Sequence, residues 1–225
     1  MTRFSCVIFD LDGTISRTNE LIFASFNHVL QTYLGTVYTP EEIVAVFGPP
    51  EEIAIERLVG KERLAPAMDD FYRYYETHHD AMATIHDGIG ELLARLDTAG
   101  VRLAIFTGKG RRTTLITLEK FGILRHFDLV VTGSDVMRHK PAGEGIEKAL
   151  AAFGARPQET LMVGDAVADV RAARETGVAI ASVLWDSYGK DDVLAMGVAD
   201  VFHTVDEFAR WIAPRALAQV EGPRA

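Results

Sequence analysis

Short runs of hydrophobic residues recur along the chain, and stretches with helical spacing separate them. The runs cover residues 4–10, 101–108, 127–133, 159–165 and 178–185, and a shorter one covers 200–203. Helical patterns fill about 111–121, 143–154 and 167–176, and a further helix stops at Gly100. Nearly continuous hydrophobic strands that alternate with helices predict an α/β fold, a Rossmann-like parallel sheet flanked by helices on both faces.

Residues 16–85 break this alternation, because they contain no convincing strand. Hydrophobic positions recur at helical spacing within 18–34, 39–47, 50–59 and 64–82. Thr39 is a suitable N-cap, and Pro40 suits the first position of a helix. We therefore expect an inserted four-helix domain at 16–85, and an α/β core built from 1–15 and 86–225.

Composition is that of a soluble globular protein, with 48% hydrophobic and 24% charged residues among 225. A net charge of −9 argues against nucleic-acid binding, which needs clustered Lys and Arg, but it permits a small anionic ligand. No hydrophobic run is long enough to cross a membrane, and the N-terminus is unlike a signal peptide. We expect a cytoplasmic protein without a membrane partner, either a monomer or a homodimer.

Polar residues follow four of the predicted strands. Asp10 and Asp12 come at the end of the first, and Gly13 allows the chain to turn sharply there. Because the carboxyl ends of parallel strands share one edge of a sheet, these groups should meet where such sheets bind ligands. The other candidates are Thr107, Gly108, Lys140, Asp165 and Asp169. Crowded carboxylates repel one another, and a hard divalent cation such as Mg²⁺ would relieve that repulsion.

Four short segments carry a family resemblance. The sequences DLDGT (10–14), TGK (107–109), KP (140–141) and GDAVAD (164–169) resemble, in this order, the four motifs of the haloacid dehalogenase superfamily. The match is to its phosphatase branch, and the insert resembles the helical cap of that branch. The resemblance extends to about residue 205. It implies a Mg²⁺-dependent phosphatase that acts on a small phosphorylated metabolite through an aspartyl phosphate.

The resemblance also implies catalytic roles. Asp10 would attack the phosphorus atom, and Asp12 would protonate the leaving oxygen and later activate water. Thr107 and the backbone amide of Gly108 would hold phosphoryl oxygens. Lys140 would neutralise charge on the nucleophile and on the phosphoryl group.

The implied metal ligands are the carboxylates of Asp10 and Asp165 and the backbone carbonyl of Asp12. Asp169 would be a water-mediated partner of the metal or a partner of Lys140. Ala166 stands where relatives often carry a hydroxyl or an amide, so one contact near the metal would be missing.

Several further residues have two interpretations. Arg17 and Lys109 are either ordinary cations or contacts for a distal anion of the substrate. Gly48 and Pro49 form either a rigid turn or a contact with the leaving group. Gly13 is also a candidate for substrate binding. His78 and His79 are interpreted as surface residues of the insert.

The substrate stays open among several classes. The subgroup looks most like phosphoglycolate phosphatase, and inorganic pyrophosphatase is the alternative, while a hexose-phosphate mutase fits less well. A phospho-receiver domain would share the acidic cluster, but no helical insert would follow its first strand. A catalytically dead binding module is disfavoured, because Asp10 and Asp12 are both present.

Overall fold

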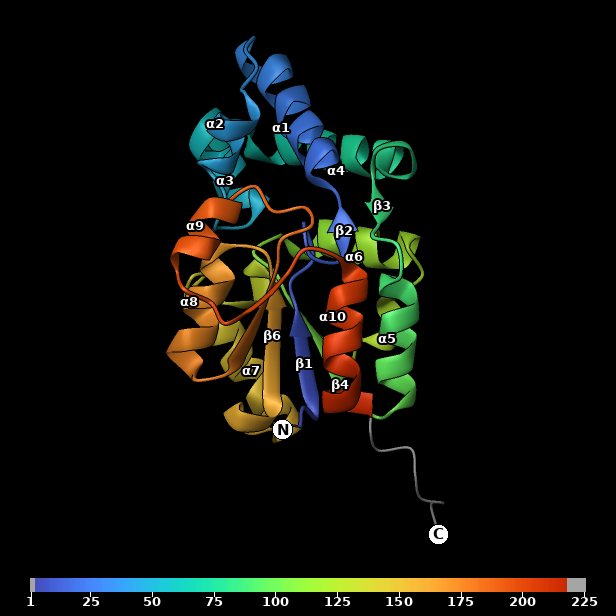
Figure 1. Cartoon of the computed structure of the whole chain (residues 1–225). Coiled ribbons are helices and arrows are strands. Elements are labelled where there is room, and N and C mark those ends of the chain that lie inside the picture. Colours follow the sequence, from blue (N-terminus) through green and yellow to red (C-terminus); the bar gives the residue numbers. More distant parts are fainter. Residues whose placement is uncertain (1–2, 218–225) are drawn as a thin grey trace.

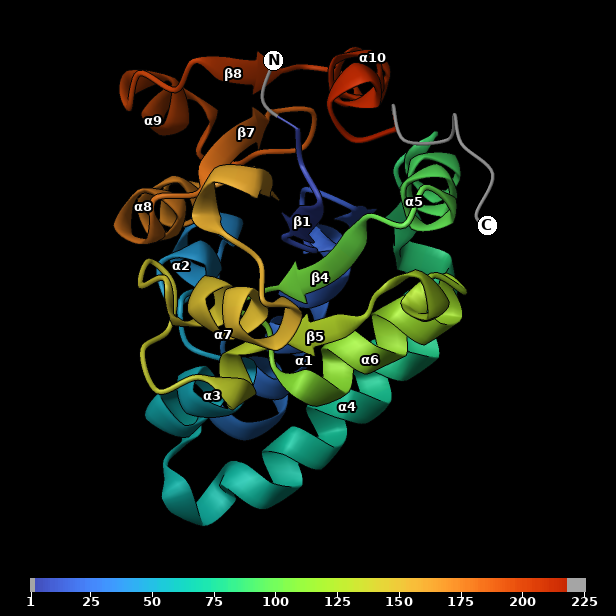
Figure 2. The same ribbon diagram turned by 90° about the horizontal axis from the view of Figure 1, so that it is seen from below.

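Six parallel strands form the central sheet of this protein, whose computed structural model describes residues 3–217. The order across the sheet is β5-β4-β1-β6-β7-β8 (Figure 2). The fold class predicted from the sequence is confirmed, and each predicted strand run contains one of these strands. The end of the predicted core, 218–225, lies outside the described residues. The strands are β1 (Cys6–Phe9), β4 (Arg102–Phe106), β5 (Leu129–Val131), β6 (Thr160–Gly164), β7 (Ala179–Val183) and β8 (Asp200–Phe202).

Helices cover both faces of the sheet, as the alternation of side chains along each strand requires. On β1, Val7 and Phe9 pack toward α5 (Ile89–Thr98), α6 (Arg111–Lys120) and α10 (Val205–Ile212). The intervening Cys6 and Ile8 pack toward α7 (Glu144–Phe153) and α8 (Val167–Thr176). The short helix α9 (Lys190–Ala195) lies beside α8. Because β1 is buried on both faces, the acidic residues that follow it are held by a rigid strand.

The inserted helices lie over the carboxyl ends of the strands (Figure 1). They are α1 (Asn19–Leu34), α2 (Pro40–Val44), α3 (Glu51–Val59) and α4 (Lys61–Met82), which we call the helical insert. A hydrophobic cluster of their own, which includes Phe26, Ile55 and Phe71, holds them together. Thr39 caps α2 as predicted, since its hydroxyl accepts a hydrogen bond from the Glu42 amide at 3.3 Å. The domain boundaries at 16 and 85 stay a prediction.

Two short strands correct the sequence analysis, which expected none between 16 and 85. β2 (Ser16–Arg17) and β3 (Thr84–Ile85) pair in an antiparallel ribbon. Each has only two residues, which is too short to give a hydrophobic pattern. The ribbon ties together the two chain crossings that lead into and out of the helical insert.

His79 is a second correction, because the sequence analysis places it on the surface of the insert. Its side chain is fully buried, and its ring lies 4.9 Å from that of Phe121. The cause is the packing of α4 against α6 of the core, which covers this face of the helix.

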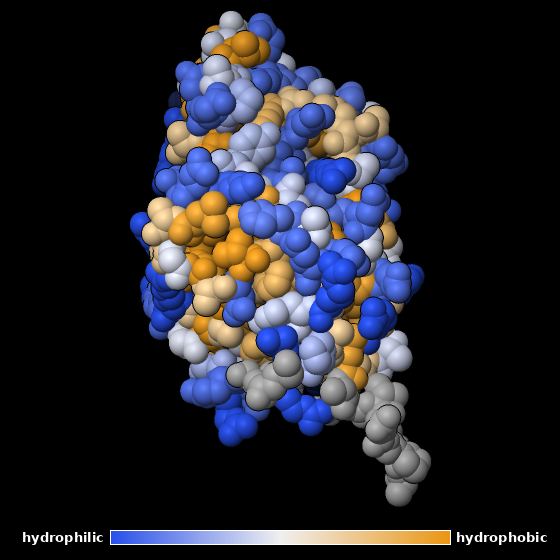
Figure 3. Space-filling model, in the orientation of Figure 1, coloured by the Kyte–Doolittle hydropathy of each residue, from blue (hydrophilic) through white to orange (hydrophobic). Residues whose placement is uncertain are grey.

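The remaining elements are short. They are the 3₁₀ turns Leu124–His126, Gly133–Asp135 and Pro157–Glu159 and the π-helical turn Ala213–Leu217. A hydrophobic area stands out in Figure 3 on the side of α8 and α9, where Leu194 of α9 is exposed. Within residues 3–217, no helix combines the length and the hydrophobicity that crossing a membrane requires.

Candidate functional site

Three carboxylates meet at the carboxyl edge of the sheet. Asp10 directly follows β1 and Asp165 directly follows β6, and these two strands are neighbours. One oxygen of each, together with one of Asp169 from the first turn of α8, lies within 4.8 Å of the others. All three residues are buried. The sheet therefore brings together groups that lie 155 and 159 positions apart in the sequence.

Lys140 joins two of these carboxylates. Its Nζ donates hydrogen bonds to Asp10 Oδ1 at 2.7 Å and to Asp169 Oδ1 at 2.6 Å. Burial alone would lower the pKa of this lysine, but Asp10 and Asp169 raise it above its ordinary value. The ammonium group is therefore charged at neutral pH. The other Asp169 oxygen accepts the backbone N–H of Ala166 at 3.1 Å. This contact uses the backbone of residue 166, so it does not depend on the side chain at that position.

The acidic cluster suits a hard cation. Burial raises the pKa of Asp10 to about 7, and Asp169 and Asp12 add to the shift against the opposing charge of Lys140. Burial also raises the pKa of Asp165, with Asp10 and Asp169 contributing. A bound divalent cation would stabilise the negative charge of these buried carboxylates in place of water. It would thereby lower their pKa values and favour their ionised forms. A donor set made only of oxygen fits Mg²⁺.

The loop after β1 fits closely around Asp165. The hydroxyl of Thr14 donates to Asp165 Oδ1 at 3.0 Å. Gly13 has a φ of +85°, and a Cβ added there would lie 2.6 Å from Asp165 Oδ2. Glycine is needed for both reasons. Gly13 lies against Asp165 and is not among the residues that line the cavity. Its predicted role in substrate binding stays a prediction.

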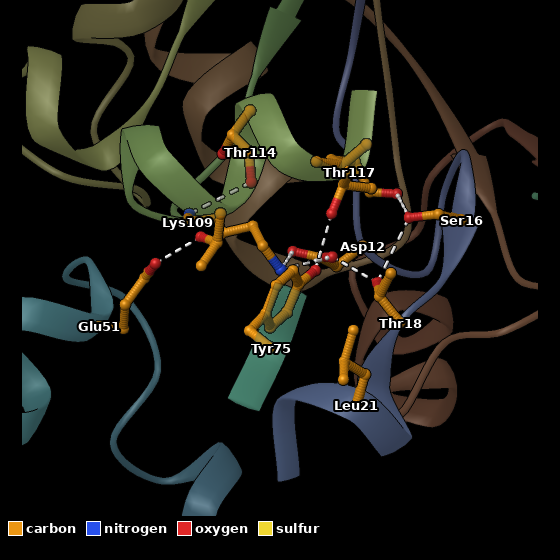
Figure 4. A network of polar contacts seen from close by, with 12 residues as sticks. Asp12, Ser16, Thr18, Leu21, Glu51, Tyr75, Lys109, Thr114 and Thr117 are labelled. Carbon is orange, nitrogen blue, oxygen red and sulfur yellow. Dashed lines mark hydrogen bonds and ion pairs between the residues drawn. The ribbon is translucent and has the colours of Figure 1, made fainter. Parts of the chain in front are cut away.

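The side chain of Asp12 has partners of its own. It accepts hydrogen bonds from the Thr18 hydroxyl and from Lys109, whose Nζ lies 3.1 Å from Oδ1 and 3.3 Å from Oδ2 (Figure 4). The ring of Tyr75, from α4, lies 4.6 Å from the same Nζ. Burial alone would lower the pKa of Lys109, but Asp12 and Tyr75 raise it. Asp12 is thus held by hydrogen bonds from Lys109 and Thr18, and Lys109 in turn lies against Tyr75 of the insert.

A cavity of about 400 Å³ separates the acidic cluster from the helical insert. Many of the predicted site residues line it: Asp10, Asp12, Gly48, Pro49, Thr107, Gly108, Lys109 and Asp165. Lys140 and Asp169, which are hydrogen-bonded to each other, are not part of the lining. Arg17 is exposed on β2 and is also absent from the lining, so the structure does not bring it to the others. Its positive charge instead contributes to the pKa values of His86 and Asp186, both of which it lowers.

Glu51 is a site residue that the sequence analysis missed. It begins α3, and its Oε2 accepts the backbone N–H of Gly110 at 2.7 Å. Its Oε1 accepts the hydroxyl of Thr113. Burial raises the pKa of Glu51, and the neighbouring Glu52 adds to the shift. Acidic residues in the first turn of a helix are common, so nothing in the sequence marks this one as a link to α6.

Comparison with known proteins adds independent findings. The sequence profile of the family described as haloacid dehalogenase-like hydrolase matches residues 7–183. Pyrophosphatase PpaX from Halalkalibacterium halodurans is 37% identical over 191 residues, which are 85% of this chain and 88% of that protein. A haloacid dehalogenase-like hydrolase from Streptococcus pneumoniae is 26% identical, with a TM-score of 0.76 over 94% of this chain and 99% of that one. A Lactobacillus plantarum structure named for phosphoglycolate phosphatase, 21% identical with a TM-score of 0.76 over 92% and 99% of the two chains, shows the same fold.

Proposed function

The chain belongs to the haloacid dehalogenase-like hydrolases, and on that premise we propose that it is a Mg²⁺-dependent phosphatase whose nucleophile is Asp10. The observation that carries the proposal is the cluster of Asp10, Asp165 and Asp169, which is bridged by Lys140 and opens on a lidded cavity. A bound Mg²⁺, held by Asp10 and Asp165, would supply positive charge to the phosphoryl oxygens.

The residues divide the reaction into two displacements. In the first, a bond forms between phosphorus and a carboxylate oxygen of Asp10, and the bond from phosphorus to the leaving oxygen breaks. In the second, a water oxygen replaces Asp10 on phosphorus. Lys140 keeps the carboxylate in place and balances its charge, because its Nζ is already 2.7 Å away. In phosphoryl transfer such positioning and neutralisation supply most of the rate.

Asp12 is the proton carrier in this proposal. It gives a proton to the leaving oxygen in the first step and takes one from water in the second. Lys109 and Thr18 orient its carboxyl group toward the cavity. Thr107 lies at the cavity wall, and its Oγ1 accepts the backbone N–H of Lys109 at 3.2 Å. The hydroxyl hydrogen of Thr107 is therefore available for a phosphoryl oxygen.

Two substrates stay as candidates at this level. Phosphoglycolate is the one that the sequence motifs suggest, and the name of the 37% identical relative favours pyrophosphate. Both would place a phosphoryl group beside Asp10, so both are compatible with the proposed chemistry.

Release of inorganic phosphate from 4-nitrophenyl phosphate tests the proposal. We expect activity with MgCl₂, its loss on chelation with EDTA, and its return when MgCl₂ is added again. Asp10→Asn should lower kcat by at least about a thousandfold, the scale seen when a nucleophile is removed, with an unchanged circular dichroism spectrum. Asp206→Asn, at an 80% exposed carboxylate on α10, is the matched control. Turnover that survives EDTA, or that Asp10→Asn leaves intact, would refute the proposal.

A further inference from the structure

The leaving-group half of the cavity lies between Asp12 and the helical insert, and its chemistry is unlike that of the phosphoryl half. We propose that it accepts an uncharged, largely apolar alcohol or phenol. The substrate class is then the phosphate monoesters of such alcohols. This inference rests on the proposed phosphatase function and narrows its substrate.

Hydrophobic side chains form the wall that faces the catalytic carboxylates. They come from α1, from α2 and the turn after it, and from α4. Phe47 belongs to this wall and is 41% exposed, and its ring is 6.5 Å from Phe26 and 6.3 Å from Phe23. Exposed aromatic rings that line a concave site are typical of surfaces that bind apolar groups. The wall consists of Ile22, Phe26, Val44, Val46, Phe47 and Phe71.

A distal anion would find no unpaired cation among the described residues around this cavity. Lys109 is the one cation among the described residues that line it, and its ammonium group is already paired with Asp12 at 3.1 Å. Arg17, the other candidate from the sequence, lies outside. Moving a phosphate or a carboxylate from water to such a wall without a partner is costly.

The helix terminus beside the cavity is already occupied as well. The N-terminus of α6 is the kind of place where a substrate anion could bind backbone N–H groups. Glu51 takes that place with its own carboxylate, at 2.7 Å from the Gly110 nitrogen, and Figure 4 shows its position beside the network around Lys109. A second anion there would have to displace the Glu51 side chain from this N–H group. Asp192, at the cavity rim, adds another negative charge.

The hydrophobic wall, the pairing of Lys109, the position of Glu51 and the carboxylate at the rim together separate two classes of substrate. Pyrophosphate and phosphoglycolate both carry negative charge on the group that leaves. Among the described residues that line the cavity, the one cation, Lys109, is already paired with Asp12, Asn19 and Tyr188 are polar but neutral, and Glu51 and Asp192 add carboxylates. A neutral alkyl or aryl group would instead bury its surface against Phe47 and its neighbours.

A series of n-alkyl phosphates tests the inference, because ethyl, butyl and hexyl phosphate differ in apolar surface and hardly in the basicity of the alcohol that leaves. Each methylene buried in the transition state should raise kcat/KM by up to about fourfold, so butyl phosphate should exceed ethyl phosphate about tenfold. Phosphoglycolate has the carbon count of ethyl phosphate but ends in a carboxylate, and its kcat/KM should be at least about tenfold lower. Pyrophosphate should be similarly poor.

Two variants connect the effect to the wall. Phe47→Ala should remove most of the dependence on chain length, while Leu34→Ala, at a 37% exposed side chain of the insert outside the cavity, should preserve it. Activity that depends on Asp10 but is flat with chain length, or highest with phosphoglycolate or pyrophosphate, would overturn this inference and leave the phosphatase assignment standing. No Asp10-dependent phosphate release from any of the five substrates would overturn both.

Discussion

Lys140 offers a sharp test of the acidic cluster, because its side chain is 6% exposed and contacts two carboxylates at 2.7 and 2.6 Å. Lys140→Met keeps an unbranched side chain that can still pack near the Phe106 ring, which lies 4.7 Å from Nζ, and removes the ammonium group with its charge and its two hydrogen bonds. Breaking a buried ion pair in this way leaves an uncompensated charge and costs about 3–5 kcal/mol of unfolding free energy. We expect that loss in the absence of divalent cations, and we expect it to shrink as the pH falls, because protonated carboxylates need no ammonium partner.

Mg²⁺ should then restore part of the loss. With the lysine gone, the cluster carries one more uncompensated negative charge, so the variant should bind the cation more tightly than the wild type does. A ligand at a hundred times its Kd stabilises the folded state by about 2.7 kcal/mol. Urea unfolding with EDTA and with MgCl₂ measures both quantities. The control is Lys148→Met, because Lys148 is 44% exposed and pairs with Glu144, and it should change stability by less than about 1 kcal/mol.

A Lys140→Met protein as stable as the wild type in EDTA would refute this reasoning. So would a variant that MgCl₂ stabilises no more than it stabilises the wild type, because the cation and the ammonium group would then not share the same carboxylates.

Three further outcomes follow from the same contacts. Arg17→Ala should leave KM within about twofold for every substrate in steady-state assays, because Arg17 is exposed and outside the cavity; a large rise in KM for charged substrates alone would contradict this. Glu51→Gln should raise kcat/KM for phosphoglycolate relative to ethyl phosphate, because it removes the carboxyl group that occupies the Gly110 N–H at the N-terminus of α6; an unchanged ratio would show that Glu51 does not face the leaving group. Folded Asp10 keeps its proton to about pH 7 and the unfolded residue loses it near 3.8, so its contribution to stability is complete at low pH and is lost as pH rises through this window. Without divalent cations, the stability of Asp10→Asn relative to the wild type should therefore increase between about pH 4 and pH 7 in urea titrations, and MgCl₂ should abolish the trend.

The strands and the order of the motifs could be predicted from sequence because they rest on local patterns. Buried parallel strands give hydrophobic runs, and Asp10, Thr107 and Asp165 each follow such a run directly. The rule that parallel strands present their carboxyl ends at one edge then places these residues together. The two-residue strands β2 and β3 gave no such pattern, since so short a ribbon needs no hydrophobic residues.

The contacts between the helical insert and the core could not be predicted in the same way. Glu51 looks like any acid in the first turn of a helix, and only the approach of α3 to α6 makes it a partner of Gly110. His79 looked like a surface residue because the sequence does not say which face of α4 meets α6. The sequence left Lys109 open between two roles, and its pairing with Asp12 depends on a contact across 97 positions. Such long-range contacts depend on packing, which local periodicity does not encode.

The phosphorylation of Asp10 is the central claim, and acid quenching during turnover tests it most directly. The enzyme is mixed with Mg²⁺ and excess butyl phosphate, quenched within the first turnovers, digested and examined by mass spectrometry. We expect a phosphoryl group on the peptide that contains Asp10, and none in Asp10→Asn. Rapid phosphate release with no phosphoryl group on that peptide at any quench time, or with one on another residue, would contradict the account.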